Sequence, residues 1–364
     1  MKKRVFSLLL ALTLLLCALP LPVHAAANEI TVYNWGQYIS DGTDESLDVI
    51  QAFEEETVIK VNYLTFDSNE SMYTKLKTGG TTFDVIIPSD YMIAKLISED
   101  MLEPLDFANI PNYEYIDEAF RDQAYDPQNA YSVPYTWGTL GIIYNSTMVD
   151  GDIDSWDAMF DEKYADNVLM IRNSRDALAA ALLDLGYDIN TTDEAQIREA
   201  YELLADAKSK GVYQSFVMDE VFGKMEGGNA AIAMYYAGDY LTMLENNPDL
   251  KFVVPKEGSN WFVDAMCVLK TAQHKEEAEA WINFIASTES SLANMDYIGY
   301  ASPNLEALEG YPAYYEETYG EPLDEERYEI MAAPDDVLAR CELYTNLPAD
   351  TLTLYNDLWT ELGI

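Results

Sequence analysis

The sequence predicts an α/β protein built from two lobes, each with a mostly parallel β-sheet covered by helices. Three observations support this prediction. Short β-rich runs alternate with helical segments along the chain, which is the pattern of β-α-β units. The alternation restarts with different residues after a β-rich connecting segment at 132–138. The length of 364 residues suits about two domains of ordinary size.

The first lobe is predicted from residues 30–101, where strands and helices alternate. β-branched and aromatic residues mark the strands, and apolar residues at near-helical spacing mark the helices. The turn residues Gly79 and Gly80 end one of these helices. The predicted strands are 30–35, 58–66 and 84–87, and the predicted helices begin near 47 and cover 69–77 and 91–101.

The second lobe is predicted to repeat the alternation from residue 140 onward. Its strands are expected at 140–144, 168–171, 230–236 and 250–254, and its helices at 175–185 and 197–208. An extended segment at 260–269 precedes a helix at 276–286. If this segment returns to the first lobe, it and the segment at 132–138 are two crossings between the lobes and together act as a hinge.

The N-terminal segment is predicted to be a secretory signal peptide over residues 1–25. Basic residues at 2–4 precede an almost wholly apolar run over 6–19, and small residues precede a cut after Ala25. Cys17 offers lipid attachment as an alternative, but leucine precedes it where a small residue is normally required. We therefore expect the protein to be secreted across the cytoplasmic membrane, into the periplasmic space or onto the outer face of that membrane.

The charge balance and the scarcity of histidine and cysteine disfavour several classes of protein. The net charge is −43, from 64 acidic and 21 basic residues, so nucleic acid and anionic lipid are poor partners. Beyond residue 25 the chain has one histidine, His274, too few for a histidine-rich zinc site. Its cysteines there, Cys267 and Cys341, are compatible with a disulfide and with buried free thiols. No glycine-rich phosphate motif occurs, and we predict no cofactor and no metal.

Four stretches in a consistent order form the most specific pattern in the chain. They are 33–38 (YNWGQY), 68–77 (SNESMYTKLK), 133–138 (VPYTWG) and 298–305 (IGYASPNL). Weaker matches occur at 88–91 (PSDY) and 261–264 (WFVD). Together these stretches resemble the spermidine/putrescine-binding proteins of bacterial ABC transporters, and the similarity runs through residues 30–310.

The resemblance implies a two-lobed periplasmic-binding-protein-like fold of type II, with a hinge and a cleft between the lobes. It implies lobe 1 at 28–139 plus 264–308 and lobe 2 at 140–263 plus 309–364. The function that it implies is that of a polyamine-binding component of an ABC importer, a monomer without enzymatic activity that delivers putrescine or spermidine to a membrane permease. The ligand-binding residues that it implies are Trp35, Gln37, Tyr38, Ser89, Tyr91, Asn173, Asp176, Tyr236, Asp239, Phe262, Asp264 and Tyr300.

Several of these positions depart from the spermidine-binding pattern. Gln37 and Asn173 stand where that pattern has acids, and Phe262 and Tyr236 stand where it has tryptophans. Asp239 resembles the putrescine-binding branch of the family instead. The departures leave the choice between putrescine and spermidine open.

The residue types suit a polyamine on chemical grounds as well. Each ammonium group needs carboxylates or other acceptors, because an unpaired charge taken out of water is costly. The methylenes need apolar walls, and an aromatic face can contact both a methylene and a cation. Asp264 in the apolar run 261–268 is the most informative position, since acids are rarely buried in strands without a partner.

Several candidate residues also have a purely structural explanation. Trp35 lies at a strand end and fits a core position. Asp239 can cap a helix over 240–244, and Ser89 can begin the helix that follows it. Asp176 lies at a helix start, where the helix dipole favours an acid whatever its function.

Three other functions are compatible with the residues alone. Tyr235 and Tyr236 resemble the adjacent tyrosines of ferric-ion-binding transport proteins of similar fold, and Fe³⁺ prefers phenolate and carboxylate oxygens. A secreted hydrolase with two catalytic carboxylates is compatible because the acidic residues offer many pairs. The third hypothesis is an adhesive surface protein, for which we expect no tightly bound small ligand.

Overall fold

The computed structural model describes residues 28–43 and 46–364, so the predicted signal peptide at 1–25, with Cys17, lies outside the described residues. In the described part the strands form one connected sheet, with the order β2-β1-β3-β9-β4-β7-β5-β6 along its main path. Beside this path β10 pairs with β9, and β8 pairs with β4. The strands are β1 (Glu29–Trp35), β2 (Lys60–Phe66), β3 (Val85–Ile86), β4 (Ser132–Asn145), β5 (Val168–Ile171), β6 (Tyr213–Val217), β7 (Ile232–Tyr236), β8 (Leu250–Val253), β9 (Ser259–Val268) and β10 (Cys341–Glu342).

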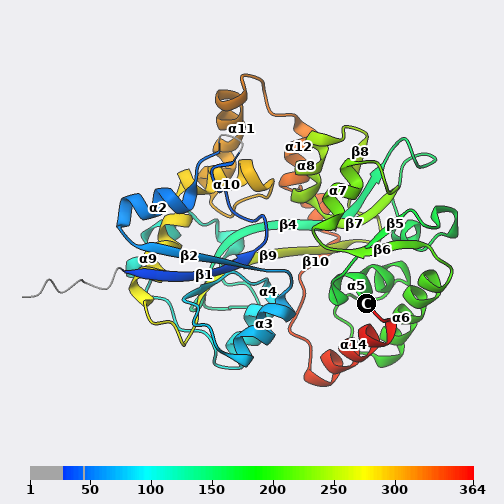
Figure 1. The fold of residues 1–364 in the computed structure, drawn as a ribbon, viewed down its shortest axis with the longest axis horizontal. Coiled ribbons are helices and arrows are strands. Elements are labelled where there is room, and N and C mark those ends of the chain that lie inside the picture. The colour runs from blue at the N-terminus through cyan, green and yellow to red at the C-terminus, as the bar shows by residue number, and fades with distance from the viewer. Residues whose placement is uncertain (1–27, 44–45) are drawn as a thin grey trace, which may run out of the picture.

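Helices cover the sheet on both sides in each half of the molecule (Figure 1). Several begin at an Asp, Ser or Asn whose side chain accepts a hydrogen bond from the backbone of the first turn, as at Asp48, Ser68 and Asn304. The helices are α2 (Val49–Thr57), α3 (Asn69–Thr78), α4 (Asp90–Ser98), α5 (Ser174–Asp184), α6 (Glu194–Ser209), α7 (Glu220–Glu226), α8 (Ala237–Asn246), α9 (Lys275–Ile285), α10 (Thr288–Ile298), α11 (Leu305–Tyr319), α12 (Glu325–Met331), α13 (Asp335–Leu338) and α14 (Ala349–Leu362).

Two long strands, β4 and β9, run through both halves and join them (Figure 1). β4 pairs antiparallel with β9 over 132–139 and with β7 over 140–144. On either side of this junction β1 is parallel to β2 and β3, and β5 is parallel to β6 and β7. The two-lobed α/β fold class is therefore confirmed. In place of the two mostly parallel sheets that were predicted, one mixed sheet has a parallel part in each lobe, and antiparallel strands join these parts. The predicted lobe boundaries at 139/140 and 263/264 fall inside β4 and β9 and stay a prediction.

The predicted elements are present, with shifts of a few residues at their ends. The helix expected near 47 begins at Val49, because the Asp48 side chain accepts from the Gln51 backbone N–H and caps it. The following strand begins at Lys60 rather than Val58, since Val58 ends α2 with a φ of 63°. β6 has no counterpart among the predictions, because its residues are mostly half-buried and show no clear alternation.

The last part of the chain packs against the second lobe. β10 pairs with β9 through Cys341 and Ser259, and α14 packs on α5 and α6 (Figure 1). Cys341 and Cys267 are both buried and both free, so they form no disulfide. This path brings the segment between β10 and α14 past the start of α5, where Tyr344 contacts Asp176.

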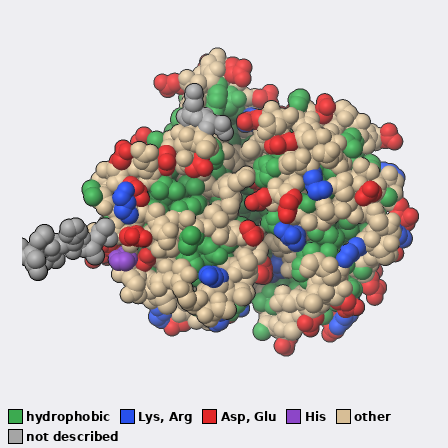
Figure 2. All heavy atoms as spheres, viewed as in Figure 1, with side chains coloured by type: hydrophobic (Ala, Val, Ile, Leu, Met, Phe, Trp, Pro, Cys, Tyr) green, Lys and Arg blue, Asp and Glu red, His purple; other side chains and the backbone are tan. Residues whose placement is uncertain are grey.

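Acidic side chains are spread over the visible face of both lobes rather than gathered in one patch (Figure 2). A smaller set is buried, and Asp84, Asp126 and Glu279 among them accept hydrogen bonds from backbone N–H groups. The other buried acids in the described residues, Asp90, Asp176 and Asp264, line one cavity. Within the described ranges, no helix combines the length and the apolar character that a membrane crossing requires.

Candidate functional site

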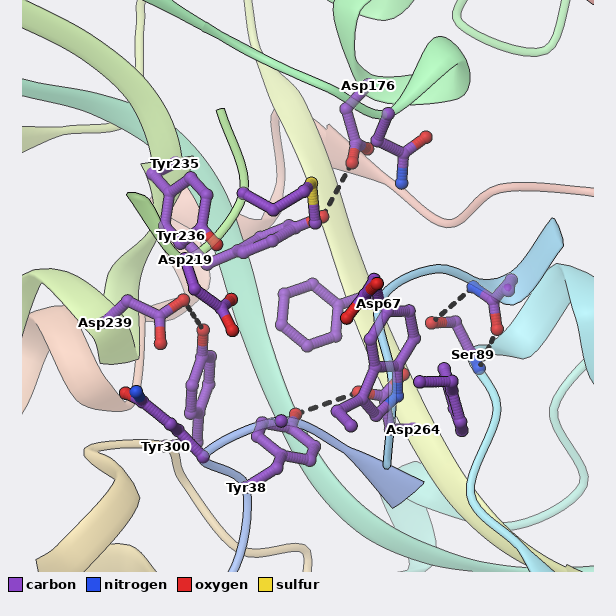
Figure 3. A pocket seen from close by; sticks show the side chains of 18 of the residues that line it. Tyr38, Asp67, Ser89, Asp176, Asp219, Tyr235, Tyr236, Asp239, Asp264 and Tyr300 are labelled. Atoms are coloured by element: carbon purple, nitrogen blue, oxygen red, sulfur yellow. Dashed lines mark hydrogen bonds between the residues drawn. The ribbon is translucent and has the colours of Figure 1, made fainter. Parts of the chain in front are cut away.

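A cavity lies between the two lobes, where the ends of several strands and helices meet (Figure 3). It holds about 820 Å³ of empty space, its open mouth included. The first lobe lines it from the end of β1, the starts of α3 and α4, and β9, and the second lobe lines it from the starts of α5, α7 and α8. The cavity brings together every residue predicted for the site, namely Trp35, Gln37, Tyr38, Ser89, Tyr91, Asn173, Asp176, Tyr236, Asp239, Phe262, Asp264 and Tyr300. That these residues bind a ligand stays a prediction.

Asp264 presents a carboxyl group to the cavity from β9. The side chain is 4% exposed, and its Oδ2 accepts a hydrogen bond of 2.8 Å from Tyr38 Oη (Figure 3). Its Oδ1 is buried without a hydrogen-bond partner among the described residues. Burial raises the pKa of Asp264 to about 6, although the nearby hydroxyls of Ser89 and Tyr38 oppose the rise. An unpaired acceptor in a cavity is suited to a ligand that donates hydrogen bonds.

Asp176 lies at another side of the cavity, in the first turn of α5. Its Oδ2 accepts from Tyr236 Oη at 2.7 Å, and its Oδ1 accepts from Tyr344 Oη at 2.9 Å. Burial raises its pKa to about 6, and these two hydroxyls oppose the rise. Asn173 caps the same helix, since its side-chain oxygen accepts from the Arg175 backbone N–H at 3.0 Å. Asp176 therefore lies at a helix start, as its structural explanation requires, and it also lines the cavity.

Asp239 is not the helix cap that the sequence suggested as its structural explanation. α8 begins at Ala237 with Tyr236 at the cap position, so Asp239 lies in the first turn. Its Oδ2 accepts a hydrogen bond of 2.9 Å from Tyr300 Oη (Figure 3). Burial raises the pKa of Asp239 to about 7, and the nearby charge of Asp219 adds to the rise. Asp239 thus bonds to the segment after α10 rather than to the backbone of its own helix.

Ser89 occupies the cap position of α4 as predicted, but its hydroxyl makes no capping hydrogen bond. Instead Asn69 Nδ2, at the start of α3, donates to Ser89 Oγ and to Tyr91 Oη, both at 3.1 Å. Tyr91 Oη in turn donates to Glu70 Oε1 at 3.0 Å. The capping explanation for the Ser89 side chain is therefore wrong, because α3 binds this hydroxyl instead.

Aromatic rings form walls between the carboxyl groups. The ring centroids of Tyr38 and Tyr300 are 5.3 Å apart, and those of Tyr300 and Phe262 are 5.9 Å apart. Phe262 and Tyr236 continue the series at 5.5 Å, and all three contacts are edge-to-face. Trp35 is partly buried and lines the same cavity, so it is not a plain core residue.

Exposed polar groups also line the cavity. Gln37 is exposed and has a φ of 50°, at the turn that follows β1. Asp67 and Asp219 line it as well, and both are exposed. Partial loss of solvent on the cavity side of Asp219, together with the charge of Asp67, raises the pKa of Asp219. A Cβ added at Gly36 would lie 3.3 Å from Asp219 Oδ2, so an acid of the second lobe lies close to the backbone of the first.

Sequence reasoning missed several residues that line the cavity. Asp90 is buried, and its carboxyl oxygens accept from the backbone N–H groups of Tyr91 at 2.5 Å and Val263 at 3.3 Å. Burial raises the pKa of Asp90 to about 8, and the charge of Asp264 adds to the rise. Tyr344 lies beyond the region that carries the resemblance, so no motif marked it. The weaker motif at 88–91 contains Asp90 and could have identified it.

Tyr235 and Tyr236 both line the cavity because β7 ends at Tyr236. Burial raises the pKa of both phenols well above the usual range, and the Tyr236 hydroxyl donates a hydrogen bond to Asp176. Both phenols are therefore neutral rather than phenolates, and Tyr236 is a hydrogen-bond donor. No group of three or more His, Cys, Asp or Glu side chains in residues 28–43 and 46–364 is arranged to hold a metal ion.

The ring of Tyr300 fits against the backbone of two glycines. A Cβ added at Gly238, in α8, would lie 2.4 Å from the ring, and one added at Gly138, in β4, would lie 3.0 Å from it. Such close approach is possible because glycine has no side chain. The two glycines thus place the Tyr300 hydroxyl within reach of Asp239.

Two lobes joined by crossing strands, with a cavity of acids and aromatic rings between them, define a protein that binds a solute in an interlobe cleft. The chain belongs to the bacterial extracellular solute-binding protein family, whose model matches residues 48–320.

Similar proteins and solved structures support this family assignment. The chain is 33% identical over 287 residues to the spermidine/putrescine-binding periplasmic protein of Salmonella typhimurium. This alignment covers 78% of this chain and 80% of that protein. It is 29% identical over 381 residues to a putrescine-binding periplasmic protein of Pseudomonas aeruginosa. That alignment covers 100% of this chain and 99% of that protein. The structure of a putative spermidine/putrescine ABC transporter protein from Listeria monocytogenes is similar with a TM-score of 0.84 at 40% identity, covering 93% of this chain and 99% of that one. These similarities confirm the family resemblance and the two-lobed fold that the sequence motifs indicated.

Gly238→Ala tests the contact between α8 and Tyr300. Alanine in a helix is ordinarily more stable than glycine by roughly 0.5–1 kcal/mol. Here we expect the free energy of unfolding to fall, because the added Cβ would collide with the ring. Urea unfolding measures the change. The matched control is Gly310→Ala in α11, where nothing lies within 4 Å of the added Cβ and stability is expected to rise. A rise of similar size in both variants would contradict the contact.

Proposed function

We propose that this protein is the extracytoplasmic substrate-binding component of a polyamine ABC importer and that it binds putrescine or spermidine in the cavity between its lobes. The observation that carries the proposal is the position of Asp176, Asp239 and Asp264 on three sides of an aromatic-walled cavity (Figure 3). The names of the relatives and the signal-like N-terminal segment support it. The protein acts as an exported monomer that docks on a membrane permease, and it performs no chemical step and needs no cofactor.

The hydrogen-bonding capacity of the carboxyl groups suits ammonium ligands. Asp264 and Asp239 each accept one tyrosine hydroxyl and Asp176 accepts two, which leaves further lone pairs on every carboxylate. An alkylammonium group carries three donors and a full charge, so it can use those lone pairs. Because the acids lie on different sides of the cavity, two ammonium groups on one chain can reach different carboxylates.

The apolar part of the ligand also has a place in this cavity. The rings of Phe262 and Tyr300 lie beside the acids, and a methylene chain between the ammonium groups can pack on them. Aromatic faces attract cations as well, so a ring that contacts the methylenes also favours the neighbouring ammonium. A sugar or a neutral amino acid offers no such pair of cations.

The raised pKa values of these acids support a cationic ligand. Burial raises the pKa of Asp176, Asp239 and Asp264, which means that the empty cavity disfavours their charged forms. A dication offsets this cost, since it supplies the opposite charge where solvent is excluded. The negative field of the whole chain attracts the same ligands from solution.

Asp264→Asn tests the proposed function most simply. The substitution keeps the side-chain volume and removes the charge that meets an ammonium group. We expect polyamine affinity to fall by on the order of 1.5–3 kcal/mol, the value of a charge-assisted hydrogen bond. Isothermal titration calorimetry with putrescine and spermidine measures the affinity. In the unmodified protein both ligands are expected to raise Tm, whereas neutral sugars leave it unchanged.

The matched control for this experiment is Asp126→Asn. Asp126 is also buried, but it accepts from the backbone N–H groups of Ala130 and Tyr131 and from the Ser132 hydroxyl, in the turn before β4. This variant is expected to lose stability and keep its polyamine affinity. Unchanged affinity in Asp264→Asn would assign that residue a structural role. Negligible thermal shifts with every polyamine, in a folded protein, would refute the proposed function.

We further expect putrescine to bind more tightly than spermidine. Gln37 is exposed, and the side-chain oxygen of Asn173 already accepts from Arg175, so neither offers a carboxylate to a third ammonium. The general negative field favours the higher charge of spermidine, but salt screens it beyond about 8 Å at physiological strength. Competition calorimetry at that ionic strength decides between the ligands. Clearly tighter binding of spermidine would show that these two positions do not set selectivity.

A further inference from the structure

Arg175 is the one buried Lys or Arg in the described part of the chain, at 2% exposure. It lies in the first turn of α5, next to Asp176. Its hydrogen bonds are long, at 3.3 Å from Nη1 to the Thr345 carbonyl oxygen and 3.4 Å from Nη2 to Asn190 Oδ1. Its Nε has no hydrogen-bond partner among the described residues. Hydrogen bonding alone therefore does not account for this buried cation.

The guanidinium group instead lies over three tyrosine rings from three different segments. Its central carbon is 4.5 Å from the ring centroid of Tyr344, 5.2 Å from that of Tyr91 and 5.7 Å from that of Tyr355. Tyr91 belongs to α4 of the first lobe, Tyr355 belongs to α14, and Tyr344 lies in the segment between β10 and α14. A planar cation over aromatic faces is stabilised more strongly when it is desolvated, as it is here.

Asn190 holds the backbone of the segment that contains Tyr344. Asn190 Nδ2 donates to the Leu343 carbonyl oxygen at 2.9 Å, and Asn190 Oδ1 accepts from the Thr345 backbone N–H at 2.8 Å. These bonds fix the backbone on either side of Tyr344. Its ring then contacts the Arg175 guanidinium group, at 4.5 Å, and the edge of the Tyr91 ring, whose centroid is 5.9 Å away. With the ring placed, Tyr344 Oη donates to Asp176 Oδ1 at 2.9 Å.

We propose that Arg175 is a positioning residue of the binding site, whose guanidinium group holds the Tyr344 ring so that the Tyr344 hydroxyl reaches Asp176. This inference rests on the proposed function only for the class of ligand that Asp176 meets. Arg175 itself does not contact the ligand. It joins the C-terminal segment, α5 and the first-lobe residue Tyr91 into one side of the cavity.

A second consequence is electrostatic. The titratable and charged groups around Asp176 are Arg175 on its own helix, Glu70 from α3, Tyr91 from α4, Tyr235 and Tyr236 from the end of β7, and Tyr344. Burial raises the pKa of Asp176, the two tyrosine hydroxyls lower it, Glu70 raises it, and Arg175 lowers it. Removal of Arg175 therefore takes away a positive charge and also loosens the Tyr344 hydroxyl, and both changes raise the pKa of Asp176.

The test compares Arg175→Met, Arg175→Lys and Tyr344→Phe with the unmodified protein. The methionine variant keeps much of the volume and removes the charge, whereas the lysine variant keeps the charge and loses the planar group. The first readout needs no ligand. We expect carboxyl-detected NMR to show a higher pKa for Asp176 in Arg175→Met, with partial rescue in Arg175→Lys. We also expect faster hydrogen exchange over residues 343–362 in Arg175→Met.

The second readout is putrescine affinity as a function of pH. In Arg175→Met we expect a loss of about tenfold, which corresponds to about 1.4 kcal/mol, and a shift of the pH midpoint of binding to higher values. Tyr344→Phe is expected to shift the midpoint in the same direction, by less. Leu250→Ala, a buried truncation in β8, controls for lost stability and is expected to leave the midpoint unchanged.

The outcomes separate this inference from the proposed function. If the unmodified protein binds no polyamine but Arg175→Met raises the pKa of Asp176 and speeds exchange over 343–362, the proposed function fails and the positioning role stands. If polyamine binds and Arg175→Met changes neither the Asp176 pKa nor the pH midpoint, the positioning role is wrong. If Arg175→Met does not fold, Arg175→Lys decides, and an Asp176 pKa and affinity equal to those of the unmodified protein overturn the role of the planar group.

Discussion

Burial of Asp176, Asp239 and Asp264 in one cavity raises their pKa values to about 6, about 7 and about 6, respectively, because a charged carboxyl group loses its hydration there. Each acid receives at least one tyrosine hydroxyl, which reduces the cost without cancelling the charge. The carboxylates therefore keep an unmet requirement for positive charge. The polyamine proposed above would satisfy this requirement, and the acidity of the whole chain adds a favourable long-range field.

The fold places these acids by bringing element ends together from both lobes. Asp176 and Asp239 lie in the first turns of α5 and α8, where the helix dipole favours an acid, whereas Asp264 lies on β9, a strand that crosses between the lobes. The hydroxyl partner of Asp264 is Tyr38 from the turn after β1, and that of Asp239 is Tyr300 from the turn after α10. Each of these bonds therefore joins segments that lie far apart in the chain.

Much of this arrangement was predictable, and the part that was not has a physical reason. The resemblance to a known family marked Trp35, Asp264 and Tyr300, because each lies in one of the short motifs that carry the resemblance. The residue pattern placed β1, β2, β3, β5 and β7, because β-branched, aromatic and apolar runs mark buried strands, but it did not mark the half-buried β6. Tyr344 was not predictable, since its place beside Asp176 depends on how the C-terminal segment packs on α5. The bond of Asp239 to Tyr300 also depends on tertiary packing, so local sequence suggested a helix cap instead.

The number of protons exchanged when putrescine binds tests the central claim most directly. The empty site carries partly protonated carboxyls near pH 6.5, and an ammonium ligand lowers their pKa values, so binding must expel protons. Calorimetry near pH 6.5 in two buffers of different ionisation enthalpy gives the count. The account predicts net proton release, with affinity that rises as the pH increases from about 5.5 to about 7.5. Tight binding with no proton release and a flat pH profile would contradict it.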